Sequence, residues 1–198
     1  MHDVVAALRA VVAGDPALGL APGPVITAGD SAGANLALAA MLHEQAAGRR
    51  AGEGALLFYG VYGADLDTRS YRHFAEGPGL TRGRMERFWN HYALAPGLRA
   101  DPLAAPILAS DAALRALPPL HLTAAGIDPL LSDSLAFAAR LAALGRTEKL
   151  AVTQGVVHGY LQMSEFLPAA LADVLAAGQI AGHMAARAMA DRAWGGMI

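Results

Sequence analysis

Ser31, Asp128 and His158 are the side chains of this sequence whose types fit nucleophilic catalysis. A serine hydroxyl is a weak nucleophile by itself and needs a neighbouring base. Histidine suits that task because its unperturbed pKa lies near neutrality, and an aspartate can fix its tautomer and stabilise its charged form. The three residue types therefore predict acyl transfer through Ser31, with His158 as the base and Asp128 as its partner.

The elements that must position these residues follow from the hydrophobic pattern. Short apolar runs bounded by Gly or Pro predict buried strands at 24–28, 54–63, 118–126 and 149–159. Helical patterns lie between and around them, at 31–48, 80–94 and 132–145, with a first helix entered from Asp3, Ser132 as an N-cap, and a long closing helix. The alternation indicates one domain, 1–198, with a parallel sheet covered by helices and a mixed insertion at 64–117.

The three candidate residues follow three of these strands. In a parallel sheet, functional groups gather at the carboxyl ends of the strands. Ser31, Asp128 and His158 fall at such ends in the order Ser, Asp, His, which is the order of an α/β-hydrolase triad. We therefore expect them to meet at one edge of the sheet.

The stretch "AGDSAGANL" (28–36) predicts a sharp turn from strand to helix at Ser31. Gly29 and Gly33 lack side chains, so the strand and the helix can approach closely around a strained nucleophile. Ser31 would lie at the helix N-terminus, where the helix dipole favours a developing negative charge. We expect the N–H of Ala32 to donate to that oxyanion.

Each of these residues also has a purely structural interpretation. With 22 glycines in the chain, G-x-S-x-G can arise by chance. Asp128 precedes a proline and can serve as a turn residue, and His158 can be an ordinary loop histidine. The joint order at three strand ends favours the catalytic interpretation. The other histidines inside predicted elements, and most of an aromatic stripe at 85–92, are interpreted as structural or solvated.

Composition excludes several functions. The chain has 198 residues, 55% of them hydrophobic, which suffices for one core. A net charge of −2 with scattered basic residues does not fit a nucleic-acid binder. The chain has no cysteine, no metal-ligand motif and no nucleotide loop, so we expect no metal and no cofactor. Asp3 and Arg9 interrupt the first apolar run, which argues against a signal peptide.

We expect no stretch to be long and apolar enough to span a membrane, and residues 167–187 come closest. We therefore expect a cytoplasmic protein that binds neither a membrane nor nucleic acid. A single lysine among abundant Ala and Arg suggests a bacterial source.

Beyond single residues, the sequence resembles the hormone-sensitive-lipase-like esterases of the α/β-hydrolase superfamily. "GDSAGANLA" is similar to their nucleophile elbow, G-D-S-A-G-G-N-L. Further similar stretches follow in order, "AEGPGLTRGRMERFWNHY" (75–92), "DPLAAPILA" (101–109), "GIDPLLSDS" (126–134) and "VVHGY" (156–160). The resemblance implies the α/β-hydrolase fold and hydrolysis of short-chain carboxylic esters without a cofactor. It gives Ser31, Asp128 and His158 the triad roles and places a cap-side helix in the 64–117 insertion.

The sequence also departs from the family pattern. Ala34 replaces an elbow glycine, Ser132-Asp133 replaces an acidic pair, and Ala105 stands where serine is common. The family's H-G-G-G motif, which supplies most of its oxyanion hole, does not occur, and His158-Gly159 is the only His-Gly pair. By the resemblance, the strands here correspond to strands 5–8 of a truncated sheet. Because one lost oxyanion donor costs on the order of 10²–10³ in rate, we expect impaired activity.

The same correspondence makes the strand at 24–28 an edge strand. An apolar edge is a pairing hazard, so we expect exposed apolar surface there and a route to a homo-oligomer. Two alternatives to the esterase remain open: a non-catalytic relative that binds a ligand, as the plant gibberellin receptors do, and an inactive fragment. The complete triad argues for the enzyme, and the missing oxyanion motif argues for the alternatives.

Overall fold

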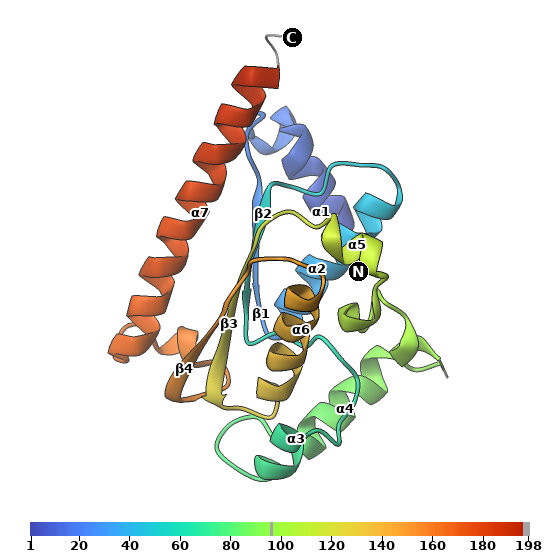
Figure 1. Cartoon of the computed structure of the whole chain (residues 1–198), viewed down its shortest axis with the longest axis vertical. Coiled ribbons are helices and arrows are strands. Elements are labelled where there is room, and N and C mark those ends of the chain that lie inside the picture. Colours follow the sequence, from blue (N-terminus) through green and yellow to red (C-terminus); the bar gives the residue numbers. More distant parts are fainter. Residues whose placement is uncertain (96, 196–198) are drawn as a thin grey trace.

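Four parallel strands form one sheet at the centre of the molecule (Figure 1). The computed structural model of this chain describes residues 1–95 and 97–195. The strands lie side by side in chain order: β1 (Ile26–Asp30), β2 (Gly54–Phe58), β3 (Leu120–Ile127) and β4 (Leu150–Val157). Since all pairs are parallel, the carboxyl ends share one edge of the sheet. The predicted parallel sheet is confirmed.

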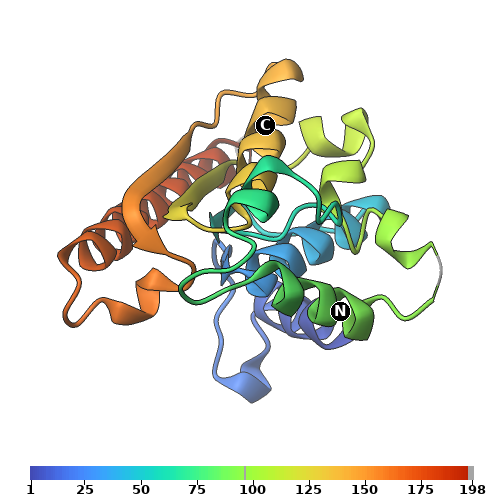
Figure 2. The same ribbon diagram turned by 90° about the horizontal axis from the view of Figure 1, so that it is seen from below.

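Helices cover both faces of this sheet (Figures 1 and 2). On one face lie α1 (His2–Ala13), α2 (Ala32–Ala46) and α6 (Leu131–Ala143), and on the other lies α7 (Pro168–Gly195). Short 3₁₀ turns lie at η1 (Pro16–Leu18) and η4 (Tyr160–Met163). The helical periodicity predicted α2 and α6 to within a few residues.

The two faces of the sheet bury separate apolar cores. The first packs α2 and α6 against the strands through large side chains such as Leu38, Leu57 and Phe137. The second packs α7 against the other face, and the helix contributes mainly alanines, with Ala170 and Ala177 fully or nearly buried. The core on the α2 face therefore contains more large buried side chains than the core on the α7 face.

Two differences from the sequence prediction have a clear structural cause. β2 was expected to continue to residue 63 but ends at Phe58, because Tyr59 takes a left-handed conformation with φ 37°. Ser132 was expected to cap α6, yet α6 begins one residue before it. The Ser132 hydroxyl instead donates to Ser70 Oγ at 2.8 Å and accepts the Ser70 N–H at 3.1 Å. A tertiary partner thus replaces the local capping role.

The segment between β2 and β3 carries three helices and two 3₁₀ turns. They are α3 (Arg69–His73), α4 (Arg82–Tyr92), η2 (Leu98–Ala100), η3 (Pro106–Leu108) and α5 (Asp111–Arg115). Buried Met85 and Trp89 of α4 pack with Tyr71 and Leu130 in a small core of their own. This core holds α4 above the carboxyl ends of the strands (Figure 1).

Helix α7 corrects one sequence expectation. By length and composition alone, its stretch Pro168–Ala193 is long and apolar enough to cross a membrane, and only 11% of its most apolar window is buried. The expectation that no segment reaches this threshold is therefore wrong.

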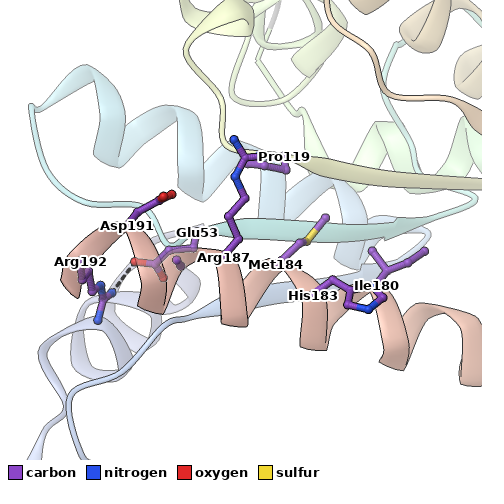
Figure 3. A pocket seen from close by; sticks show the side chains of 9 residues that line it. Glu53, Pro119, Ile180, His183, Met184, Arg187, Asp191 and Arg192 are labelled. Atoms are coloured by element: carbon purple, nitrogen blue, oxygen red, sulfur yellow. Dashed lines mark hydrogen bonds and ion pairs between the residues drawn. The ribbon is translucent and has the colours of Figure 1, made fainter. Parts of the chain in front are cut away.

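Contacts at the far end of α7 tie it to the sheet. Figure 3 shows Glu53, just before β2, paired with Arg192 at 2.5 Å, beside Met184, which packs on Gly54. A groove of about 660 Å³ runs there, at the amino-terminal ends of the strands and opposite Ser31.

Strand β1 is an edge of the sheet, as predicted. It pairs with β2 on one side only, and none of its residues is fully buried. An apolar trough of about 410 Å³ lies beside it, lined by β1, α1 and α2 through residues such as Val11, Ile26 and Leu36. The expected apolar surface at this edge is present.

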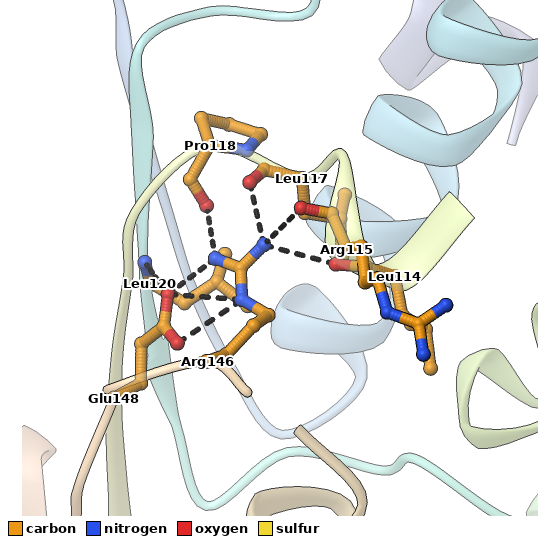
Figure 4. Close-up of polar contacts among 7 residues, drawn as sticks. All are labelled: Leu114, Arg115, Leu117, Pro118, Leu120, Arg146 and Glu148. Atoms are coloured by element: carbon orange, nitrogen blue, oxygen red, sulfur yellow. Dashed lines mark hydrogen bonds and ion pairs between the residues drawn. The ribbon is translucent and has the colours of Figure 1, made fainter. Parts of the chain in front are cut away.

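One buried cation organises the loops before β3. The Arg146 guanidinium donates to the carbonyl oxygens of Leu114, Arg115, Leu117 and Pro118 at 2.6–3.3 Å and pairs with Glu148 (Figure 4). Its side chain is only 10% exposed. These carbonyls would otherwise lack a partner after α5 ends.

We expect Arg146→Ala to lower the free energy of unfolding by about 3 kcal/mol, because it leaves Glu148 and several carbonyls unpaired. Urea denaturation measures the change. Arg115→Ala is the matched control, since the Arg115 side chain is exposed and the Arg146 contact uses only its carbonyl. An equal, small effect of both substitutions would show that Arg146 carries no such role.

Candidate active site

The turn at Ser31 joins β1 directly to α2. Ser31 adopts φ 54° and ψ −119°, a conformation that is rare and strained outside glycine. Its N–H donates to the carbonyl of Phe58 at 2.9 Å and its carbonyl faces the N–H of Val61 at 3.4 Å. Contacts from the β2 loop therefore hold the strained residue in place.

Sterics at this turn require one of the two elbow glycines. A Cβ on Gly29 would lie 2.3 Å from the backbone carbonyl of Gly33, a distance no folded backbone tolerates. A Cβ on Gly33 would meet only Asp30 Oδ1, at 3.8 Å. The close approach of strand and helix thus depends on Gly29, and the expectation that Gly33 shares this role is not met at its own Cβ position.

Ser31, His158 and Asp128 form one hydrogen-bonded chain. His158 Nε2 lies 2.8 Å from Ser31 Oγ, and His158 Nδ1 lies 2.7 Å from Asp128 Oδ2. Asp128 is 1% exposed, and its other oxygen, Oδ1, accepts the N–H of Leu130 at 2.9 Å. A carboxylate only accepts, so Nδ1 carries the proton and Nε2 is free to accept from Ser31. The three residues predicted from the strand ends lie within hydrogen-bonding distance.

Tyr59 lies behind this chain and was not singled out from the sequence. Its ring meets the His158 ring edge-on, with centroids 5.0 Å apart, and its hydroxyl donates to Asp30 Oδ2 at 3.2 Å. Burial and the Asp30 carboxylate raise the pKa of Tyr59, which keeps the hydroxyl protonated. Tyr59 therefore links the residue before Ser31 to the imidazole. The sequence placed Tyr59 inside the strand predicted at 54–63, so it gave no signal for this contact.

An apolar cavity of about 570 Å³ opens beside Ser31. Its walls come from α2, the β2 loop and α4: Ser31, Ala32, Asn35, Leu36, Val61, Met85, Phe88, Trp89, His91 and Tyr92. Met85 and Trp89 are buried, as expected for core packing, but Phe88 and Tyr92 are 57% and 47% exposed. The aromatic stripe of α4 thus serves both as a core and as a cavity wall.

Asn35 ties the cavity walls together, one helical turn after Ser31. Its Nδ2 donates to the carbonyls of Val61 and Ala104, both at 2.8 Å, and its Oδ1 faces the Tyr92 hydroxyl at 3.4 Å. It is only 4% exposed. The only sequence signal for this residue was its place in the elbow motif.

Asp133, in the first turn of α6, is a second buried carboxyl near Asp128. It accepts the N–H of Gly63 at 3.1 Å and is 4% exposed. Burial raises the pKa of Asp133 to about 7, with smaller contributions from the Asp128 and Asp65 charges, against the opposing backbone N–H groups. The folded chain therefore favours the protonated form of Asp133 far more than the unfolded chain does.

This shift gives the stability a pH dependence of known sign. The raised pKa means that ionisation of Asp133 opposes folding, so stability is lost as pH rises toward and through about 7. Between pH 5 and pH 8, we expect the unfolding free energy of the wild type to fall by about 2 kcal/mol more than that of Asp133→Asn. Urea titrations of both proteins at the two pH values measure this, with the exposed Asp191→Asn as control. Parallel pH profiles for wild type and Asp133→Asn would contradict it.

Ala32, the predicted oxyanion donor, directly follows Ser31. Ala32 is the first residue of α2 and lines the cavity beside Ser31. Its N–H has no acceptor within the helix and is available to a ligand.

Within residues 1–95 and 97–195, no three His, Asp or Glu side chains group as metal ligands do.

Known esterases and lipases are similar to this chain in sequence. The chain is 34% identical over 174 residues to carboxylesterase NlhH of Mycobacterium tuberculosis, covering 86% of this chain and 54% of that protein. It is 37% identical over 91 residues to hormone-sensitive lipase of Bos taurus, covering 46% of this chain and 12% of the lipase. The chain spans about half the length of the curated bacterial relatives it matches.

The fold has solved counterparts. A thermostable esterase from Pseudomonas putida ECU1011 superposes with a TM-score of 0.81 at 32% identity, covering 87% of this chain and 55% of that one. The predicted resemblance is thereby confirmed. A family model described as alpha/beta hydrolase fold matches residues 1–162, and this chain belongs to that family.

Proposed function

We propose that this protein is a serine hydrolase that cleaves short-chain carboxylic esters through an acyl-enzyme on Ser31. The observation that carries the proposal is the chain Ser31–His158–Asp128, at 2.8 and 2.7 Å, beside an apolar cavity. The similarity to carboxylesterase NlhH and to a solved esterase supports an ester as the substrate.

In the proposed first step, Ser31 Oγ attacks the ester carbonyl carbon while His158 Nε2 takes the hydroxyl proton. The carbonyl oxygen gains negative charge near the Ala32 N–H and the N-terminus of α2. Asp128 stabilises the charged imidazole through Nδ1. When the tetrahedral intermediate collapses, the C–O bond to the alcohol breaks, and the alcohol leaves with the proton from His158.

In the second step, water replaces the alcohol. His158 Nε2 removes a proton from water while the water oxygen attacks the acyl carbon. His158 then passes this proton to Ser31 Oγ as the carboxylic acid leaves. The sum is ester plus water to acid plus alcohol, with no redox change. No cofactor enters either step.

The cavity favours a small apolar group on the substrate. Phe88, Trp89 and Val61 present hydrocarbon surface to the cavity. The side-chain amide of Asn35 is already hydrogen-bonded to backbone carbonyls. A volume of about 570 Å³ also accommodates the alcohol part of a short ester. We propose that these 198 residues hydrolyse the ester at a modest rate, because the oxyanion donor identified in their sequence is the N–H of Ala32.

Hydrolysis of p-nitrophenyl butyrate by the purified 198-residue chain tests the proposal. We expect saturable turnover that stops when a fluorophosphonate labels the protein, with the added mass on the peptide containing Ser31. p-Nitrophenyl laurate is the matched comparison, and we expect at least tenfold lower kcat/KM for it. Turnover that persists after complete labelling would overturn the proposal.

A second candidate function is ligand binding without turnover, which the apolar cavity beside Ser31 supports by itself. In that case the same cavity binds a small ester or acid, and labelled Ser31 accumulates without catalytic turnover. Calorimetric binding of butyrate with no hydrolysis of the butyrate ester would favour this function.

For the partners, we propose a small-molecule ester substrate, no nucleic acid, no membrane, and self-association through the open edge of β1. The apolar trough beside β1 supports association between copies. Sedimentation over a hundredfold concentration range tests it, and a single monomeric species throughout would reject it. We also propose a cytoplasmic location.

A further inference from the structure

A partly buried polar cluster joins the C-terminal helix to the loop that carries His158. Asp173, in the second turn of α7, accepts the Tyr160 hydroxyl at 2.5 Å and the Thr153 hydroxyl at 2.6 Å, both on Oδ2. Tyr160 is completely buried, and burial together with the Asp173 carboxylate raises its pKa to about 12. The Tyr160 hydroxyl is therefore a permanent donor, and the α7 carboxylate is its partner.

Tyr160 is close to the imidazole in both sequence and space. It stands two residues after His158, across Gly159, which has φ 80° and precedes η4 as its N-cap. Its ring packs against Tyr59 with centroids 5.5 Å apart, and Tyr59 in turn meets the His158 ring at 5.0 Å. The backbone on one side of the imidazole and the aromatic ring behind it thus both depend on where Tyr160 sits.

We propose that Asp173 of α7, acting through Tyr160, is a positioning residue that holds His158 between Ser31 and Asp128. This inference rests on the proposed use of His158 as a base. Asp173 lies outside residues 1–162, which match the family model. The helix thereby has a catalytic consequence although none of its side chains lines the cavity beside Ser31.

The physical reason is that the Asp173 contact anchors this loop two residues beyond His158. Gly159 gives the backbone a flexible joint directly after His158. The two hydrogen bonds of the imidazole fix the ring only while the loop stays in place. A shift of about 1 Å in a catalytic group can cost up to about 10² in rate.

Tyr160→Phe and Asp173→Asn test the inference in the full chain. Tyr160→Phe removes one oxygen and leaves Thr153 bound to Asp173, so the variant should fold. Asp191→Asn is the matched control, because it makes the same chemical change on the same helix at an exposed position. Urea unfolding of each variant at the working temperature shows that all are fully folded there.

The first measurement is the proton NMR resonance of His158 Nδ1–H, which lies far downfield when the proton is held by Asp128. Its assignment follows from its loss in His158→Gln. We expect the resonance to broaden or vanish in Tyr160→Phe and Asp173→Asn, and to stay unchanged in Asp191→Asn. A resonance unchanged in both test variants, or absent in wild type, would overturn the proposal.

The second measurement is the rate at which a fluorophosphonate labels Ser31 in the folded proteins. We expect labelling about tenfold slower in Tyr160→Phe and Asp173→Asn, with the Asp191→Asn rate equal to wild type. Equal rates in all four proteins would show that Asp173 only stabilises the fold. Neither measurement requires ester turnover, so a wild type that hydrolyses no ester would reject the proposed function while leaving this inference decidable.

Discussion

Ser31→Ala is expected to lower kcat/KM for p-nitrophenyl butyrate by at least about 10⁴-fold and to abolish fluorophosphonate labelling. In the proposed mechanism the hydroxyl forms the acyl bond, and His158 Nε2, 2.8 Å away, has no other proton to take from the protein in that step. Loss of the nucleophile in a serine hydrolase commonly removes several orders of magnitude in rate. Steady-state kinetics and intact-protein mass spectrometry measure both effects.

The fold should survive this substitution. Ser31 holds its strained backbone through its own N–H and carbonyl, which alanine retains. Ser110→Ala serves as the control, because it removes a hydroxyl that caps α5, remote in sequence from the elbow. Residual turnover in Ser31→Ala above one part in a hundred would exclude an acyl-enzyme on this residue.

Asp128→Asn is expected to lower kcat by about 10⁴-fold with little change in KM. The Leu130 N–H needs an acceptor at the Oδ1 position, so the amide oxygen of the asparagine must take that place. The amide NH₂ is then turned toward His158 Nδ1, which has to accept instead of donate. The imidazole proton moves to Nε2, and the ring can no longer remove the Ser31 proton.

This argument predicts a specific rescue. Because the loss arises from the wrong tautomer, a stronger base in solution should restore part of the rate, and the activity of Asp128→Asn should keep rising with pH above the range where wild type levels off. The neighbouring Asp133→Asn carries the same change without contact to the imidazole and should leave kcat within about threefold. A kcat loss in Asp128→Asn no larger than that of Asp133→Asn would exclude the role assigned to Asp128.

The sequence predicted the sheet and the three side chains that meet at its edge, because both depend on local patterns. Ser31, Asp128 and His158 could be found since buried strands precede them and parallel strands end at one edge. The elbow glycine Gly29 was predictable for the same reason, as its constraint involves a residue only four positions away.

The parts that sequence reasoning missed depend on partners far apart in the chain. Tyr59 contacts His158 only because a left-handed residue ends β2 early. Ser132 carries the local signature of a cap, but Ser70, 62 residues away, takes its hydroxyl. The Asp173–Tyr160 contact crosses from α7 to the β4 loop, and although Tyr160 ends the stretch "VVHGY", nothing in the sequence pairs it with Asp173.

Because α7 contributes mainly alanines to the core beneath it, this helix should be the first part of the protein to unfold. Units with little buried apolar surface open at a lower free energy than the whole domain, so α7 should detach transiently while the other face stays folded. Amide hydrogen exchange should then be faster in α7 than in α2 under native conditions. Because Asp173 leaves with the helix, heating would inactivate the enzyme reversibly several degrees before the main unfolding transition.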